Sequence, residues 1–245
     1  MPRFGRAVLL AAVFVAAVFA SLRLAHKDAG STASALSREL REGSTPWHAR
    51  RRAFEAARAR DAGSVVFLGD SITAGWNTLE RDFPGLKVAN RGISGDTSLG
   101  LVWRLEADVM SLHPRAVVVL IGTNDLAGGS SVEEAASNID HLVFFIQSLK
   151  PGTPVILCRV MPRGREPGKF PERIIALNSW IDRIAKARGA AVCDTFGPLA
   201  AADGTDRPGE FYDHLHPNAA GYEKWRRALS PIFKEIGLNS STFPQ

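Results

Sequence analysis

Five short runs of apolar residues, each followed by a longer segment with helical periodicity, constrain the fold of this chain most. The runs are apolar throughout instead of alternating with polar residues, which is typical of strands covered on both faces and therefore of a parallel sheet. They lie at Val65–Leu68, Val88–Asn90, Ala116–Ile121, Val155–Met161 and Ala190–Asp194.

The longer segments predict amphipathic helices that cover such a sheet. In three of them the apolar residues recur three or four positions apart and so share one helix face. These faces consist of Val132, Ala136, Ile139, Val143 and Ile146, of Ile174, Leu177, Ile181 and Ile184, and of Tyr222, Trp225, Leu229, Ile232 and Ile236. The predicted fold class is α/β, a three-layer α/β/α sandwich with a doubly wound parallel sheet of about five strands.

The two cysteines fall on the fourth and fifth apolar runs, at Cys158 and Cys193. Neighbouring parallel strands seldom bring two cysteines into the geometry that a disulfide needs. We therefore expect two buried free thiols.

The first quarter of the chain differs from the rest. Arg3 and Arg6 precede an apolar stretch over residues 7–22, a pattern typical of a secretory signal peptide or, if it is not cleaved, of a membrane anchor. Either alternative predicts an exported protein, periplasmic or otherwise extracytoplasmic. The predicted organisation is a signal peptide or N-terminal membrane anchor (1–26), a polar linker (27–46) and an α/β domain (47–245).

The net charge of +5 taken alone favours a nucleic acid or an anionic membrane as partner. Residues 1–62, however, carry eleven basic and five acidic side chains, which leaves nineteen basic and twenty acidic side chains in residues 63–245. The excess positive charge thus belongs to the N-terminal part, and we expect no nucleic-acid partner.

Polar motifs follow the carboxyl ends of the first three predicted strands, where doubly wound sheets bind ligands. Ser71 can present its Oγ and its own N–H to a substrate oxygen, although Asp70-Ser71 is also typical of a helix N-cap. Gly92 lets the backbone approach a ligand closely, and Asn124 can donate its amide to an oxyanion. Taken alone, the Ser71 motif is more typical of an N-cap, the Gly92 motif is equally typical of a tight turn, and Asn124 is more typical of a turn.

A fourth motif, Asp213-His214-Leu215-His216-Pro217, precedes the last predicted helix. A carboxylate three residues before an imidazole can orient it and stabilise its protonated form. The alternative is a metal site built from Asp213, His214 and His216, because H-x-H pairs ligate metals. The other histidines lie in the leader or in predicted helices, away from the strand ends, so we expect no metal.

In this order, the four motifs resemble the GDSL or SGNH hydrolase superfamily, whose name lists the residue types matched here by Ser71, Gly92, Asn124 and His216. The resemblance runs from about residue 47 to residue 237. Four segments most resemble the catalytic subunits of platelet-activating-factor acetylhydrolase and their bacterial relatives: 91–97, 103–105, 122–125 and 161–164. The resemblance implies a flavodoxin-like fold and serine esterase chemistry without a metal or another cofactor.

This resemblance assigns roles to the motif residues. Ser71 is the expected nucleophile, His216 the general base and then acid, and Asp213 the residue that orients the imidazole. The N–H groups of Ser71 and Gly92 and the amide of Asn124 form the expected oxyanion hole.

The substrate is less constrained by the sequence. Arg163 and Trp76 are candidates for the substrate rim, with local ion pairing and helix packing as equally open alternatives. The expected substrate is a carboxylic ester with a short acyl group such as acetyl, carried by a lipid, a glycan or a small molecule. Transfer of the acyl group from Ser71 to a glycan hydroxyl, by an exported O-acyltransferase, is the alternative.

Overall fold

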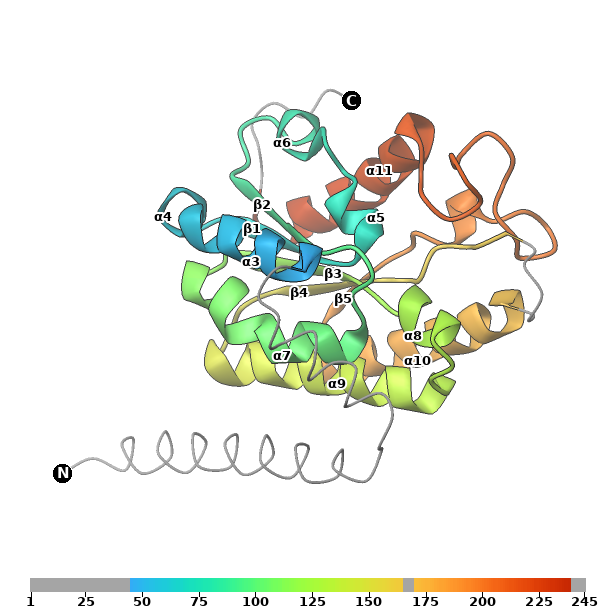
Figure 1. Cartoon of the computed structure of the whole chain (residues 1–245), viewed down its shortest axis with the longest axis horizontal. Helices are drawn as coiled ribbons and strands as arrows, with labels where there is room; N and C mark the ends of the chain where they lie inside the picture. Colours follow the sequence, from blue (N-terminus) through green and yellow to red (C-terminus); the bar gives the residue numbers. More distant parts are fainter. Residues whose placement is uncertain (1–44, 165–169, 239–245) are drawn as a thin grey trace. The chain divides into compact units, whose positions relative to one another are not determined.

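The computed structural model describes residues 45–164 and 170–238, and within them five strands form one parallel sheet (Figure 1). The strand order is β2-β1-β3-β4-β5, so the chain winds outward in both directions from β1. This order is the flavodoxin-like doubly wound arrangement, and it confirms the predicted fold class. The strands are β1 Val65–Gly69, β2 Val88–Gly92, β3 Ala116–Leu120, β4 Val155–Cys158 and β5 Ala191–Cys193.

The strands form where the apolar runs predicted them because both faces of the sheet are covered. Every residue of β1 and of β3 is buried. The fourth run is longer than its strand, since β4 ends at Cys158 instead of Met161. Val160 stays buried, but its N–H and C=O pair with the side-chain amide of Asn178 at 2.7 and 3.0 Å, and not with a neighbouring strand.

Helices cover the two faces in separate groups (Figure 1). On one face lie α7, α9 and α10, and on the other lie α5, α6 and α11. On that second face the rings of Trp76, Phe83 and Trp225 pack on Phe67 of β1. The helices are α3 Pro46–Ala56, α4 Arg58–Asp61, α5 Ser71–Ala74, α6 Leu79–Asp82, α7 Ser98–Asp108, α8 Thr123–Ala127, α9 Val132–Leu149, α10 Phe170–Arg188 and α11 Ala219–Glu235.

The two cysteines face each other across β4 and β5, where Cys158 is in register with Cys193. Both are buried free thiols, as the sequence predicts. Burial raises the pKa of the Cys158 thiol well above its ordinary range.

The chain divides into two units, residues 1–52 and 53–245, and the sheet and the site discussed below lie in the second. The predicted leader (1–26) and all but the end of the predicted linker (27–46) fall outside the described residues. Among the helices that the structure does describe, none is both long enough and apolar enough to span a bilayer.

Candidate active site

Three of the predicted site residues lie at the carboxyl ends of adjacent strands. Ser71 is the first residue of α5, directly after β1, and Gly92 is the last residue of β2. Asn124 is the second residue of α8, just beyond β3. Because β1 lies between β2 and β3, the fold brings these residues to one edge of the sheet, at the point where the winding direction reverses.

The turn between β1 and α5 is built around a glycine and an N-cap. A Cβ on Gly69 would lie 2.3 Å from the Oγ1 of Thr73 and 2.4 Å from the carbonyl oxygen of Leu120, so a larger residue does not fit there. The Asp70 side chain caps α5 by accepting the N–H of Ile72 at 2.9 Å. The N-cap interpretation therefore holds for Asp70, and Ser71 stands one position further on, at the start of the helix.

Asp70 also has an unusual pKa for an aspartate. Its side chain is 1% exposed. Burial, helped by the negative charges of Asp96 and Asp125, raises its pKa to about 7.

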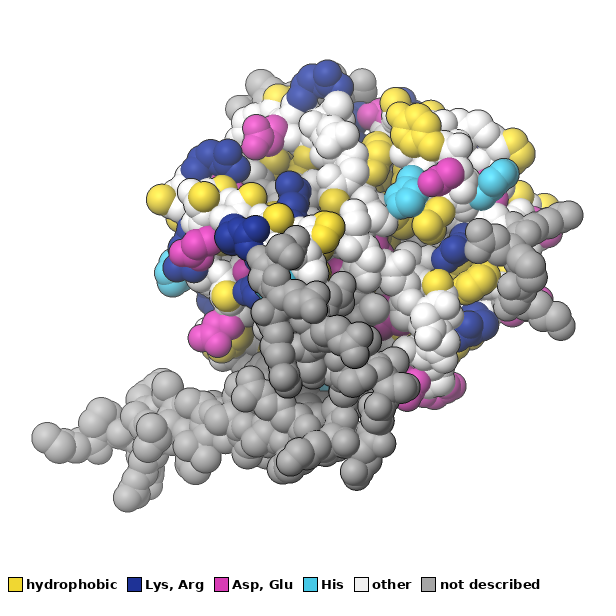
Figure 2. Space-filling model, viewed as in Figure 1, with side chains coloured by type: hydrophobic (Ala, Val, Ile, Leu, Met, Phe, Trp, Pro, Cys, Tyr) yellow, Lys and Arg dark blue, Asp and Glu magenta, His cyan; other side chains and the backbone are white. Residues whose placement is uncertain are grey.

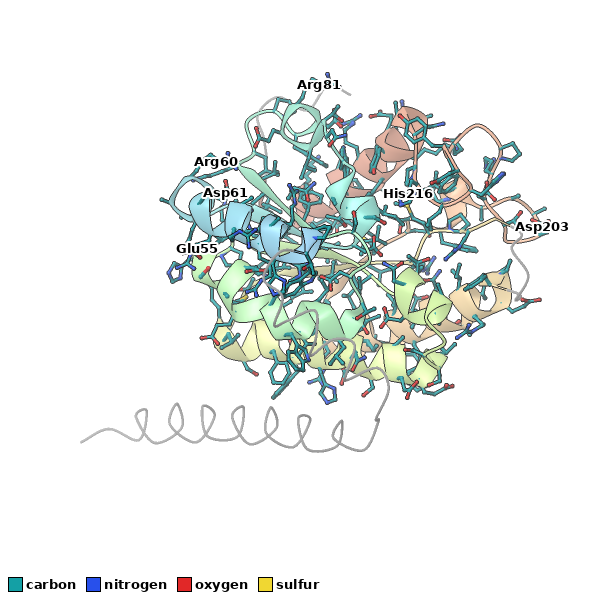
Figure 3. The ribbon with its side chains drawn as sticks, in the orientation of Figure 1. Glu55, Arg60, Asp61, Arg81, Asp203 and His216 are labelled. Carbon is teal, nitrogen blue, oxygen red and sulfur yellow. The ribbon has the colours of Figure 1, made fainter. Side chains whose placement is uncertain are left out.

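Ser71 and His216 meet although 145 positions separate them in the sequence. The Oγ of Ser71 lies 2.9 Å from Nε2 of His216, and Nδ1 of His216 lies 2.7 Å from Oδ2 of Asp213. His216 is in the loop that precedes α11, beside α5 (Figure 3). The structure thus lines up hydroxyl, imidazole and carboxylate in the order that nucleophilic serine catalysis requires.

Asp213 is held in place by the loop that it organises. Its Oδ1 accepts the N–H groups of Leu215 and His216, at 3.2 and 2.7 Å. The bonds from the backbone N–H and the ring of His216 lower the pKa of Asp213 below its ordinary value. The side chains of Asp213 and His216 are 55% and 35% exposed, and histidine and acidic side chains reach the surface together on the face shown in Figure 2.

A tyrosine of α11 joins this loop region to the nucleophile. The hydroxyl of Tyr222 donates to the carbonyl of Ile72 at 2.8 Å, inside the short helix that Ser71 begins. The ring of Tyr222 also stacks on Trp76. The position of α11, and with it the histidine loop, is therefore fixed relative to α5.

Two of the three predicted oxyanion donors, at Gly92 and Asn124, are already hydrogen-bonded. A Cβ on Gly92 would lie 2.2 Å from the nitrogen of Ala74, so α5 packs directly on the end of β2. The N–H of Gly92 donates to Oδ1 of Asn90 at 2.9 Å, and Nδ2 of Asn124 donates to the carbonyl of Asp96 at 2.9 Å. The amide of Asn124 keeps a second N–H for a ligand, whereas an oxyanion at Gly92 has to share its N–H with Asn90.

Asn90 is a site residue that the sequence reasoning missed. Besides accepting from Gly92, it donates through Nδ2 to the carbonyl of Thr73 at 2.6 Å. It therefore ties the end of β2 to the helix that carries Ser71. The available signal was a polar residue closing an otherwise apolar run, which by itself is typical of any strand end.

The two rim candidates have different surroundings. Trp76 is 1% exposed, and its ring packs against Trp225 with 4.6 Å between centroids while its N–H donates to Asp82. It is therefore a core residue and not part of a substrate rim, because the turn after α5 directs the indole inward. Arg163 follows β4 and lies over the ring of Phe170, at 4.7 Å from its centroid.

Next to the triad, the surface has a cavity of about 720 Å³. His214 lines it in a left-handed backbone conformation (φ 63°), with Nδ1 2.9 Å from Asp206 and with its carbonyl accepting the N–H of Gly164. The full lining is Gly164, Ala201, Ala202, Asp203, Thr205, Asp206, Pro208, Asp213 and His214. His214 and His216 bond to different aspartates, and among the described residues no three acidic, histidine or cysteine side chains gather to hold a metal ion.

Comparisons with known proteins identify the family. Residues 67–224 match the GDSL-like Lipase/Acylhydrolase family. The chain is 30% identical over 200 residues to platelet-activating factor acetylhydrolase IB subunit alpha1 of Rattus norvegicus, covering 80% of this chain and 85% of the relative. It is 28% identical over 177 residues to the alpha2 subunit of Homo sapiens, covering 70% and 76% respectively.

A solved structure gives the same result. The crystal structure of a GDSL-like lipase from Bacteroides thetaiotaomicron superposes with a TM-score of 0.70 at 28% sequence identity, covering 76% of this chain and 97% of that one. Sequence and structure therefore point to the same family. The chain belongs to the GDSL-like lipase/acylhydrolase family, whose chemistry is the hydrolysis of esters.

Proposed function

We propose that this protein is a serine esterase that works through an acyl-Ser71 intermediate without a metal. The observation that carries the proposal is the continuous chain of contacts from Ser71 through His216 to Asp213, with distances of 2.9 and 2.7 Å. Such a chain lets the imidazole take the serine proton while the carboxylate stabilises the imidazolium that results.

The steps follow from this geometry. The Oγ of Ser71 attacks the acyl carbon as its proton passes to Nε2 of His216, and the carbonyl electrons become an oxyanion. The N–H groups of Ser71 and Gly92 and the free N–H of Asn124 stabilise that charge. When the oxyanion collapses, the alcohol leaves with the proton from His216. Water then repeats the sequence on the acyl-Ser71 and releases the acid.

Two observations bear on the acyl group of the substrate and on the acceptor that takes it from Ser71. The relatives at 28–30% identity are named acetylhydrolases, which supports a short acyl group. The exposed side chains of His216 and Asp213 support water as the acceptor, because solvent can reach the acyl-enzyme directly. Nothing in the described residues specifically supports a glycan acceptor.

Replacing the nucleophile tests the proposal. Ser71→Ala is expected to lower turnover of p-nitrophenyl acetate by roughly 10⁴-fold or more. Thermal unfolding should stay nearly unchanged, since only one part-buried hydroxyl is lost. Ser179→Ala is the matched control, because the Ser179 hydroxyl only bonds back to Ile175 within α10 and is exposed. Turnover by Ser71→Ala comparable to that of the control would refute the proposed role of Ser71.

A further inference from the structure

A fully buried arginine lies behind the proposed oxyanion hole. Arg104 of α7 is 0% exposed, whereas the adjacent Trp103 is 46% exposed, so the helix turns the arginine and not the tryptophan inward. Its Nε donates to Oδ2 of Asp96 at 2.7 Å, and its Nη1 lies 3.8 Å from a carboxylate oxygen of Asp108. Two buried carboxylates thus offset the cost of burying the guanidinium.

Arg104 also binds the ends of two strands. Its Nη2 donates to the carbonyl of Gly69, the last residue of β1, at 3.1 Å, and to the carbonyl of Arg91 in β2 at 2.8 Å. The carbonyl of Arg91 and the N–H of Gly92 belong to one planar peptide group and point in opposite directions. The bond that fixes this carbonyl therefore also fixes the direction of the Gly92 N–H.

A second path leads from Arg104 to the other predicted donor. The carboxylate of Asp96 is bound by Arg104, and the main-chain carbonyl of the same residue accepts Nδ2 of Asn124 at 2.9 Å. Asp96 is 5% exposed, so no solvent competes strongly for its bonds. One guanidinium therefore supports the orientation of two of the three proposed oxyanion donors.

The charge of Arg104 adds to this geometric effect. A cation bonded to a peptide carbonyl polarises the peptide group and makes its N–H a stronger donor, and the effect is larger where water is excluded. The Arg91–Gly92 peptide is in this position, between the buried guanidinium and the site where negative charge develops.

We propose that Arg104 is a positioning residue for ester hydrolysis, which orients and polarises the Gly92 N–H and, through Asp96, orients the Asn124 amide. The inference rests on the proposed function. It adds a residue that does not touch the substrate and acts only through the oxyanion donors.

Arg104→Lys tests this role. Lysine keeps the charge, but its single ammonium lacks the fork geometry that binds Asp96 and two carbonyls together. We expect kcat on p-nitrophenyl acetate to fall by about 10- to 100-fold with KM nearly unchanged, because the donors act on an oxyanion that exists only during the reaction. Circular dichroism gives the folded fraction of each protein. Rates are then compared per folded molecule, at a temperature below the unfolding transitions of the wild type and the variant.

Arg188→Lys is the matched control. Arg188 makes two bonds to the carboxylate of Asp140, at 2.7 and 2.6 Å, and the substitution removes this pair as well. The pair joins α9 to α10, away from the strand ends that carry the site. It is expected to keep the wild-type kcat. A wild-type kcat in Arg104→Lys as well would overturn the proposal, since the arginine would then be only a structural tie.

A double-mutant cycle with Asn124→Ala tests whether Arg104 acts through the Asn124 amide. If Arg104 acts partly through Asn124, the double variant loses less than the product of the two single losses. A loss equal to that product would overturn the link to Asn124. If Arg104→Lys does not fold, Asp96→Asn tests the same link: it keeps the volume and the carbonyl of residue 96 but removes the ion pair, and a wild-type kcat would count against the proposal.

The proposed function and this inference fail in distinguishable ways. Turnover that survives Ser71→Ala rejects the esterase mechanism itself. Turnover that needs Ser71 but is insensitive to Arg104 rejects only the positioning role.

Discussion

Asp70 contributes both to the structure of the site and to the stability of the fold. It caps α5 directly before the nucleophile, yet it is buried near two other carboxylates, and its pKa rises from 3.8 to about 7. Between these two pH values the folded protein binds a proton at Asp70 that the unfolded chain has released. The contribution of Asp70 to the free energy of unfolding therefore falls as the pH rises from about 4 to about 7 and then levels off.

Asp70→Asn is expected to remove this pH dependence. Asparagine keeps an oxygen that can accept the Ile72 N–H, so the N-cap survives, but the side chain no longer ionises. Between pH 5 and pH 8, the melting temperature of the wild type should therefore fall by several degrees more than that of the variant. In a domain of this size, about 1 kcal/mol corresponds to roughly 2–4 °C.

Calorimetry at the two pH values provides the measurement. Other groups titrate in both proteins, and the comparison cancels them. Melting temperatures that move in parallel in the two proteins would show that Asp70 does not gain a proton on folding.

At the scale of secondary structure, the sequence predicted most where burial leaves few alternatives. Strands covered on both faces have to be apolar throughout, so the runs locate β1, β2 and β3 to within two residues. The same reasoning made the fourth strand too long, because a buried loop is as apolar as a strand when a side chain such as Asn178 satisfies its backbone.

The candidate site was predictable only in part, for a related reason. Gly92 ends a strand, Ser71 and Asn124 come shortly after one, and topology alone brings such positions together. The partners behind them act through side-chain bonds to backbone atoms of distant elements, Asn90 to Thr73 in α5 and Arg104 to Arg91 in β2, and no local spacing encodes such contacts. For Trp76 the sequence left a rim position and helix packing equally open, because a tryptophan near a site pattern suits either, and its burial decides for the core.

The packing of α5 on β2 yields a prediction at this scale. A Cβ at position 92 would lie 2.2 Å from the nitrogen and 2.7 Å from the Cα of Ala74, and backbone atoms cannot move aside as a flexible side chain can. Gly92→Ala is therefore expected to lower the free energy of unfolding by about 1–3 kcal/mol and, by displacing α5, to abolish most ester turnover.

Urea unfolding and p-nitrophenyl acetate turnover provide the two measurements. Gly63→Ala is the control: it has open space for a Cβ but a φ of 72°, and it lies before β1, away from the strand ends that carry the site. It should lose about 1–2 kcal/mol to left-handed strain and keep its turnover. A Gly92→Ala protein with normal turnover would mean that the close approach has no role in catalysis.

For the whole molecule, charge separates the N-terminal part from the catalytic domain. Eleven basic and five acidic residues fall in residues 1–62, whereas the remaining 183 residues are nearly balanced. The site itself is built from neutral donors, buried ion pairs and an Asp–His pair that reaches the surface. The net positive charge therefore belongs to the N-terminal part and not to the catalytic domain.

That asymmetry leads to a prediction about location, since we propose that the domain is exported. Arg3 and Arg6 ahead of an apolar stretch over residues 7–22 favour retention of the N-terminus on the cytoplasmic side while the rest of the chain crosses. The full chain fused at its C-terminus to alkaline phosphatase, which needs disulfides to be active, should give phosphatase activity in a bacterial host. The same fusion without residues 1–26 should give none. N-terminal sequencing of the exported fusion then separates a cleaved signal peptide from a retained anchor. A full-length fusion that is inactive and is recovered from the cytosol would exclude export by either route.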